Sequence, residues 1–318
     1  MPITMNCLPD IGSAPQSGVA GALDWVGMEN IALPVRMAGG DGAVMQLAAR
    51  VSAFVNLSDP TARGIHMSRL YLLLDRTLAA EPLTPAALRR LLHEFLESHA
   101  GLSDRAMLRV AFDLLLRRPA LVSANSGWKA YPVEIVATLA QGHFAVDLQV
   151  DVPYSSTCPA SAALARHAIA QRFAEDFPRG KALDHAAVEH WLDSAQGICA
   201  TPHSQRSTAR VRASLAAGFD LPVAELIDAI EHALATPVQT AVKREDEQAF
   251  ARLNGENPMF CEDAARRIHA ALHADARVAD LHIRATHHES LHAHDAVAVA
   301  TKGVAGGFAP LAPISARR

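Results

Sequence analysis

The residues of this 318-residue chain that can do chemistry are cysteines, histidines and acidic side chains gathered in a few short stretches. Cys158, in YSSTCPASAALARH, stands between a strand-like run and the proline that opens an alanine-rich helix. A thiol in this setting has four interpretations: an ordinary part-buried thiol, half of a disulfide, a nucleophile or a metal ligand. The cysteine alone favours the first of these, so the choice depends on the rest of the chain.

Sixteen histidines against four cysteines is the most informative imbalance of the composition. Four of them, His287, His288, His292 and His294, lie close together in THHESLHAHDA. If this stretch is a strand, His292 and His294 share a face, because alternate side chains of a strand point the same way. A solvated polar edge and a metal site explain the cluster about equally well, since neutral imidazole is a common metal ligand.

Two further stretches add an imidazole, a cation and several carboxylates. His203 follows a proline at the start of a strand-like run, and Arg206 comes soon after it, within reach of an anion. Glu245, Asp246 and Glu247 fit a solvated turn as well as a site, and the acidic pair Glu262–Asp263 fits the first turn of a helix, where the helix dipole favours negative charge. Together, however, these stretches supply Cys, His and Glu from several elements, as catalytic zinc sites often do.

The composition is that of a globular protein with ordinary charge: 50% hydrophobic, 19% charged and a formal net charge of −4. Nucleic-acid binding is not predicted, because it usually needs a strongly basic face. No apolar run approaches the roughly 20 residues that cross a bilayer, and the N-terminal MPITMNCLPDIGSAPQ lacks the pattern of a secretory signal. The cysteines form no CxxC pair or regular framework. We therefore expect a cytoplasmic protein with reduced thiols that binds neither nucleic acid nor membrane.

The elements that must position these residues follow from the hydrophobic period of each segment. In the first half we predict strand, strand, helix, helix, strand and strand, at residues 30–37, 43–57, 84–99, 103–118, 120–139 and 143–154. Thr84 fits the N-cap of the first helix. The glycines of AGGDG fit the turn of the first hairpin, and Gln141-Gly142 fits the turn of the last one.

The second half repeats this order in part. A helical stretch between Cys158 and His203 is broken at FPRGKALD. Strand, helix, helix, strand and strand patterns then follow at 204–218, 221–235, 259–275, 278–288 and 291–303. We interpret this as two modules, 26–155 and 156–318, after a loosely ordered leader over 1–25. Short turns between neighbouring strands predict antiparallel sheets backed by helices, an α+β architecture.

Five motifs in matching order make the sequence similar to the type IB GTP cyclohydrolases. They are RGIHMSRL (63–70), SSTCP (155–159), HSQRS (203–207), VKREDEQAFARLNGENPMFCEDAARR (242–267) and ESLHAHDA (289–296). The resemblance covers most of the chain. It implies a tunnelling fold of two tandem modules, each an antiparallel sheet backed by helices, and a homotetramer with active sites at subunit interfaces. It also implies conversion of GTP and water to 7,8-dihydroneopterin triphosphate and formate, the first step of folate-type pterin synthesis.

The resemblance further implies a divalent metal ion held by Cys158, His203, Glu247 and His292. Cys158 matches the cysteine of the C-P motif and His203 the histidine of H-x-Q-R-S. His292 matches the first histidine of E-S-x-H-x-H-D, and Glu247 the carboxylate of K-R-x-D-E. Zinc suits such ligands best, although a mixed N/O/S site can also take manganese or iron. Cys158 and His203 then count as catalytic as well, because the ion would activate water.

Glu262, in F-C-E-D, corresponds to the glutamate that anchors the guanine ring, and it is the third residue assigned a catalytic role. The triphosphate carries several negative charges, so basic residues inside the matching motifs are expected to bind it. These are His66, Arg69, Arg206 and Lys243.

One position departs from the family pattern: Ala160 stands where a second cysteine is common. The four metal ligands remain, but the change motivates an alternative, a non-catalytic paralogue that binds purine or metal without turnover. A related cyclohydrolase that makes a cyclic-phosphate pterin is a second alternative. A histidine-rich metal carrier is a third, although it leaves KREDEQAFARLNGEN unexplained. The helical segment over 160–200 has no assigned role.

Overall fold

The computed structural model describes residues 19–39 and 43–310. Residues 1–18 of the predicted leader and most of the predicted glycine turn of the first hairpin lie outside this part. The strands described belong to one antiparallel sheet in sequence order. They are β1 (Leu23–Ala38), β2 (Val44–Leu57), β3 (Arg105–Pro119), β4 (Ser126–Ala140), β5 (His143–Thr157), β6 (Ser204–Leu215), β7 (Val278–His287) and β8 (Ala296–Thr301).

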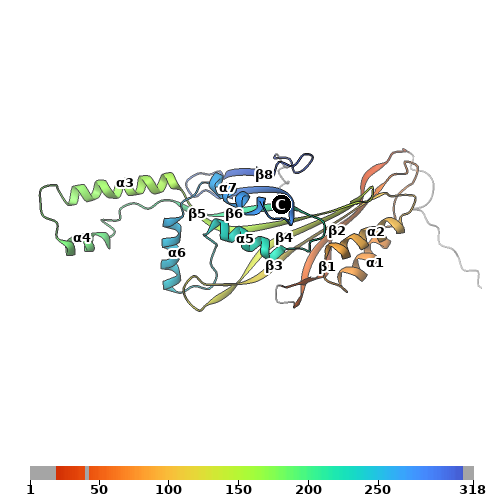
Figure 1. Ribbon diagram of the computed structural model, residues 1–318, viewed down its shortest axis with the longest axis horizontal. Coiled ribbons are helices and arrows are strands. Elements are labelled where there is room, and N and C mark those ends of the chain that lie inside the picture. The colour runs from red at the N-terminus through yellow and green to blue at the C-terminus, as the bar shows by residue number, and fades with distance from the viewer. Residues whose placement is uncertain (1–18, 40–42, 311–318) are drawn as a thin grey trace, which may run out of the picture.

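Helices are inserted after β2, β5 and β6. They are α1 (Met67–Leu78), α2 (Pro85–Ser98), α3 (Pro159–Asp176), α4 (His185–Leu192), α5 (Val223–Leu234), α6 (Arg244–Glu256) and α7 (Cys261–His273). None of these described helices is both long and apolar enough to span a bilayer. The α1–α2 pair lies at one end of the molecule, whereas α3, α4 and α6 lie at the other (Figure 1). The expected α+β architecture is confirmed, while the module boundaries remain predictions.

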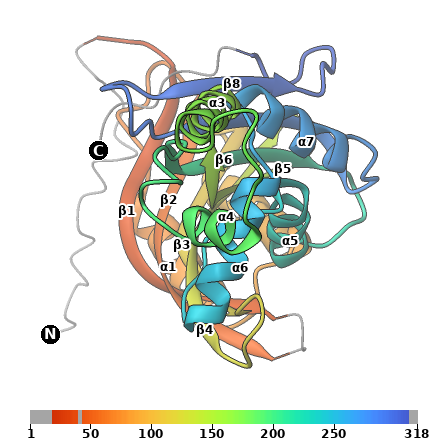
Figure 2. The same ribbon diagram turned by 90° about the vertical axis from the view of Figure 1, so that its left-hand side faces the viewer.

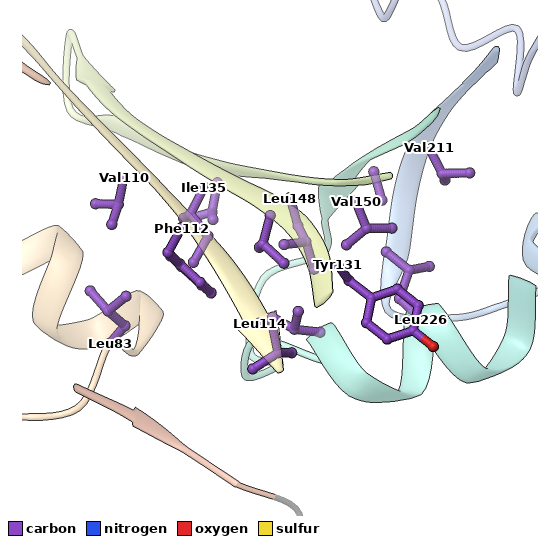
Figure 3. Close-up of a cluster of buried hydrophobic side chains, with 14 of the residues drawn as sticks. Leu83, Val110, Phe112, Leu114, Tyr131, Ile135, Leu148, Val150, Val211 and Leu226 are labelled. Carbon is purple, nitrogen blue, oxygen red and sulfur yellow. The ribbon is translucent and has the colours of Figure 1, made fainter. Parts of the chain in front are cut away.

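The core lies where one face of the sheet meets the helices. Along β3 and β4 every second residue is buried, from Ala106 to Leu114 and from Tyr131 to Leu139. Their side chains continue across β5 and β6 toward α5, whose Leu226 faces the same cluster (Figure 3). Each fully buried large apolar side chain stabilises the fold by about 1.5–3 kcal/mol.

Two local predictions are confirmed in detail. Thr84 caps α2, because its side-chain oxygen accepts a hydrogen bond from the Ala87 nitrogen at 3.1 Å. The β4–β5 hairpin turns at Gln141 and Gly142, whose φ angles are 51° and 78°. Two consecutive positive φ angles are what a two-residue type I′ turn requires.

The predicted helix over 103–118 is wrong: this segment is strand β3. Arg105, Arg109 and Asp113 recur every four residues and imitate the polar face of a helix. The alternate positions between them, such as Leu108 and Phe112, are apolar and buried, which is the period of a strand. The second helix of the pair is instead α1, which the sequence analysis did not predict.

The segment between Cys158 and His203 forms an arm. Helix α3 projects from the end of the sheet, and α4 lies near the far end of α3, from which the chain runs back to the sheet (Figures 1 and 2). The rings of Phe173, Phe177 and Trp191 pack together there, with centroid distances of 4.9–5.9 Å. The Trp191 Nε1 donates a hydrogen bond to Asp176 at 2.8 Å. The arm therefore has a small aromatic core of its own, and the predicted break at FPRGKALD is confirmed as the turn between its helices.

Candidate active site

Two of the predicted site residues meet where β5 ends and β6 begins. Cys158 is the N-cap of α3, and its backbone nitrogen donates a hydrogen bond to the carbonyl oxygen of His203 at 3.2 Å. The backbone nitrogen of His203 in turn donates to the Ser161 hydroxyl at 3.1 Å. Ser161 also donates its own backbone N–H to the Cys158 sulfur at 3.4 Å. Cys158 and His203 are therefore held side by side by backbone geometry.

The imidazole of His203 has two oxygen neighbours on one side. Its Nδ1 lies 2.9 Å from the Gln205 side-chain oxygen and 3.7 Å from the Glu289 Oε2. Glu289 is 11% exposed, and its Oε2 is buried without a hydrogen-bond partner among the described residues. Sequence reasoning assigned no role to Glu289. Its position in the motif ESLHAHDA could have marked Glu289 as a site residue, but only the histidines of that motif were considered.

Beneath this pair, polar residues run along the covered face of β5, β6 and β7. The Gln205 side-chain nitrogen donates to the Ser156 hydroxyl at 3.0 Å, and Ser156 bonds the Ser207 hydroxyl at 2.7 Å. Beside Ser207, the rings of Tyr154 and His287 meet edge to face at 5.8 Å. Burial lowers the pKa of His287 to about 4, so its ring is neutral at pH 7. Sequence reasoning noted His287 but missed the rest of this strip, because polar positions inside a strand carry no signal of burial.

Glu262 lies in the first turn of α7, close to this strip. The chain just before α7 is fixed to the sheet, because the Met259 nitrogen donates to the Thr157 carbonyl at 3.0 Å. The Cys261 thiol donates to the Glu262 Oε2 at 3.3 Å. Burial, together with this hydrogen bond, raises the pKa of Cys261 to about 11. Cys261 is therefore a buried, protonated thiol, whereas Cys158 is partly exposed.

Glu247 lies in the first turn of α6 and is exposed. Helix α6 is attached to β5 through the Ser155 hydroxyl, which donates to the Asn254 side-chain oxygen at 2.7 Å. Glu247 is two helical turns before Asn254, roughly 10 Å along the axis. The charged segment is thus a helix rather than a turn. Lys243, its N-cap, is likewise exposed.

His292 lies in the loop between β7 and β8, so the prediction that it belongs to a strand is wrong. The rings of His292 and His294 nevertheless stack, with centroids 5.1 Å apart and planes 13° from parallel. Over residues 19–39 and 43–310, no three Cys, His, Asp or Glu side chains are grouped so that they could hold a metal ion. The structure brings Cys158 and His203 together and does not bring Glu247 and His292 to them.

The predicted phosphate-binding residues are divided between the two ends of the folded molecule. Arg206 lies on β6, exposed, and Lys243 starts α6. His66 is the N-cap of α1, and the Arg69 guanidinium donates to the Ser98 carbonyl at 2.6 Å. Because α1 is at the opposite end of the molecule from α3 and α6 (Figure 1), one chain does not bring the four basic residues together.

Comparison with known proteins decides the family. A family model described as type I GTP cyclohydrolase folE2 matches residues 8–298. The chain belongs to this family. It is 49% identical over 301 residues to GTP cyclohydrolase FolE2 of Hydrogenovibrio crunogenus, covering 95% of this chain and 96% of the relative. It is 55% identical over 297 residues to the FolE2 of Pseudomonas putida, covering 93% and 96%. Membership makes the chain an enzyme of the GTP cyclohydrolase class.

Solved structures with a similar fold include the uricase of Arthrobacter globiformis. The TM-score is 0.52 at 10% sequence identity, and the match covers 92% of this chain and 98% of that one. At this identity the similarity concerns the fold alone. It confirms the tunnelling fold that the sequence motifs implied.

Proposed function

We propose that the chain is a metal-dependent GTP cyclohydrolase of type IB that converts GTP and water to 7,8-dihydroneopterin triphosphate and formate, at the start of folate biosynthesis in the cytoplasm. The observation that carries this proposal is the pairing of Cys158 with His203 at the ends of β5 and β6. Glu289 lies against the same imidazole, and Glu262 lies in the first turn of α7, just after Met259, which is bound to Thr157.

The chemistry of the donors supports a divalent metal ion at this end of the sheet. A partly exposed thiol and an imidazole lie together, beside a buried carboxylate oxygen that has no hydrogen-bond partner in the described part of the chain. Thiolate, imidazole and carboxylate are the ligand types that zinc takes. Cys158 and His203 would hold the ion with Glu247 and His292, and such a mixed N/O/S site can also take manganese or iron. When bound, such an ion supplies a Lewis acid that lowers the pKa of a coordinated water toward about 7.

The remaining residues would bind and orient the substrate. The Glu262 carboxylate accepts hydrogen bonds only, so it can pair with two N–H groups of a guanine ring and fix its orientation. Arg206 and Lys243 lie at the same end of the molecule as Cys158 and can pair with phosphate oxygens. Met259, anchored to Thr157, holds the start of α7 and hence Glu262 in place.

A second copy of the chain would supply His66 and Arg69. His66 is the N-cap of α1 and Arg69 lies in its first turn, at the other end of the molecule from Cys158 (Figure 1). An active site that uses both groups therefore needs the α1 end of a neighbouring subunit. This supports the homotetramer with interfacial active sites that the family resemblance implied.

The first experiment measures formate release from GTP, and fluorescence of the oxidised pterin, with zinc or manganese added. The wild type should release formate, Cys158→Ala should not, and Cys199→Ala should behave as the wild type. Cys199 is the matched control because it is a free, exposed cysteine on the neighbouring loop. GTP binding without formate release would instead favour the non-catalytic paralogue that Ala160 suggests.

The second experiment tests the shared site by subunit mixing. Cys158→Ala and Arg69→Ala carry their defects at opposite ends of the folded molecule. Mixed after dissociation, the two inactive variants should regain activity, since some interfaces would combine two intact halves. Arg76→Ala, on the outer face of α1 in an exposed ion pair with Glu94, is the control for Arg69. Failure to regain activity would place the site within one chain.

A further inference from the structure

Gln205 is a buried amide to which the family resemblance assigned no role. It is 8% exposed and lies at the start of β6, opposite Ser156 of β5. Both ends of its amide are used: the nitrogen donates to the Ser156 hydroxyl at 3.0 Å, and the oxygen lies 2.9 Å from His203 Nδ1. The amide is therefore held in one orientation with its oxygen directed at the imidazole.

Both oxygen atoms near His203 Nδ1 are acceptors. The Gln205 amide oxygen and the Glu289 carboxylate, at 3.7 Å, have no proton to give. An imidazole nitrogen between two acceptors has to carry the proton itself, and in a neutral ring the other nitrogen is then unprotonated. The described part of the chain offers no hydrogen-bond partner for His203 Nε2, so its lone pair remains available.

We infer that Gln205 is a positioning residue that fixes His203 as the Nδ1–H tautomer and so presents the Nε2 lone pair to the reaction site. The inference rests on the proposed function in one respect, namely that His203 Nε2 is used there. Ser207 contributes to this positioning, because its 2.7 Å hydrogen bond holds the Ser156 hydroxyl, which in turn orients the Gln205 amide.

The backbone around His203 supports the same conclusion. Its carbonyl oxygen is bound to Cys158 and its nitrogen to Ser161. With the main chain fixed on both sides, the remaining freedom of the ring is rotation about its side-chain torsions, and the Gln205 oxygen limits that rotation. Removing an outer partner of a functional histidine typically lowers metal affinity or activity about 10- to 100-fold.

The test reads the tautomer directly. In protein labelled with 15N-histidine, free of substrate, nitrogen–proton correlation spectra at a pH where the ring is neutral report which nitrogen of His203 carries the proton. The His203 signals are assigned by their loss in His203→Gln. The wild type should give Nδ1–H alone. Gln205→Met, of similar length but without the acceptor, should give a mixture, and Gln205→Glu should restore Nδ1–H.

Turnover and stability are measured on the same variants. Gln205→Met should lower kcat for formate release about 10- to 100-fold, and Gln205→Glu should recover part of it. Gln149→Met, a partly exposed glutamine on β5, is the matched control and should change neither reading. An Nε2–H ring in the wild type, or an unchanged tautomer in a folded Gln205→Met, would overturn the inference. Absence of formate release from the wild type would overturn the proposed function alone, because the tautomer is read without substrate.

Discussion

Asp246 accepts two hydrogen bonds from Ser123, at 2.8 Å from the backbone nitrogen and 2.6 Å from the hydroxyl. The same carboxylate accepts from the nitrogens of Val122 and Lys243, both at 2.8 Å. It thereby fastens the start of α6 to the turn between β3 and β4, more than a hundred residues earlier. These donors, the Lys243 nitrogen above all, hold the pKa of the Asp246 carboxyl well below its usual range.

Asp246 is therefore expected to fix the position of its neighbours Lys243 and Glu247. Asp246→Ala should lower the melting temperature and weaken GTP turnover, because the four donors lose their acceptor. Glu245→Ala, exposed on the same turn, should change neither. Since the folded pKa is depressed, the stabilisation is present above pH 3.8 and is lost as the pH falls below it. Melting curves of both variants at pH 7 check the first expectation, and an unchanged Asp246→Ala would refute it.

His287 should make the protein less stable in mild acid. Burial lowers its pKa from 6.5 to about 4, so between these values the unfolded chain binds a proton that the folded chain does not. The free energy of unfolding should fall by about 1.4 kcal/mol per pH unit in this interval from His287 alone. His287→Gln should remove that part of the slope in urea titrations from pH 7 to 4. His288→Gln, whose side chain is 47% exposed, should keep it. Equal slopes in all three proteins would contradict the assignment.

Glu262 and Asp263 are adjacent acids with different expected effects. Asp263 accepts from the Phe260 nitrogen at 3.1 Å and so caps α7, whereas Glu262 is proposed to bind guanine. Glu262→Gln should reduce kcat/KM for GTP about 10- to 100-fold, because hydrogen bonds to a charged group contribute about 1.5–3 kcal/mol. Asp263→Asn should mainly lower stability, by about 0.5–2 kcal/mol. Steady-state kinetics with thermal melts separate the two, and a reversed pattern would move the guanine site away from Glu262.

The arm should unfold separately from the sheet. Trp191→Ala removes the ring that packs on Phe173 and Phe177 and the donor that binds Asp176. Limited trypsin digestion should then cut faster after Arg179 and Lys181, between α3 and α4, while the melting transition of the sheet stays in place. Trp128→Ala, a 62% exposed tryptophan on β4, is the control. A loss of the main transition in Trp191→Ala would mean that the arm is part of the cooperative core.

Local sequence determined much of the fold. The Thr84 cap, the Gln141-Gly142 turn and the period of α5 and α7 each depend on neighbours a few residues away, so they could be predicted. The wrong prediction of a helix at β3 also came from a local pattern. Its charges at Arg105, Arg109 and Asp113 match a helical face. Pairing with β4 along its whole length, and with β2 over residues 106–112, selects the strand.

For the site, the sequence alone determined the chemical types of the residues and the family, because the motifs around Cys158, His203 and Glu262 identify both. Tertiary structure decided which of these residues meet. Pairing of β5 with β6 sets Ser156 opposite Gln205, which contacts His203, and Glu289 reaches the same imidazole from the loop after β7. The start of α1, with His66 and Arg69, lies at the far end of the molecule from Cys158. Contacts between residues distant in the chain depend on strand register and helix packing, which no local pattern encodes. Burial also depends on these distant contacts, and it is the largest cause of the lowered pKa that keeps His287 neutral.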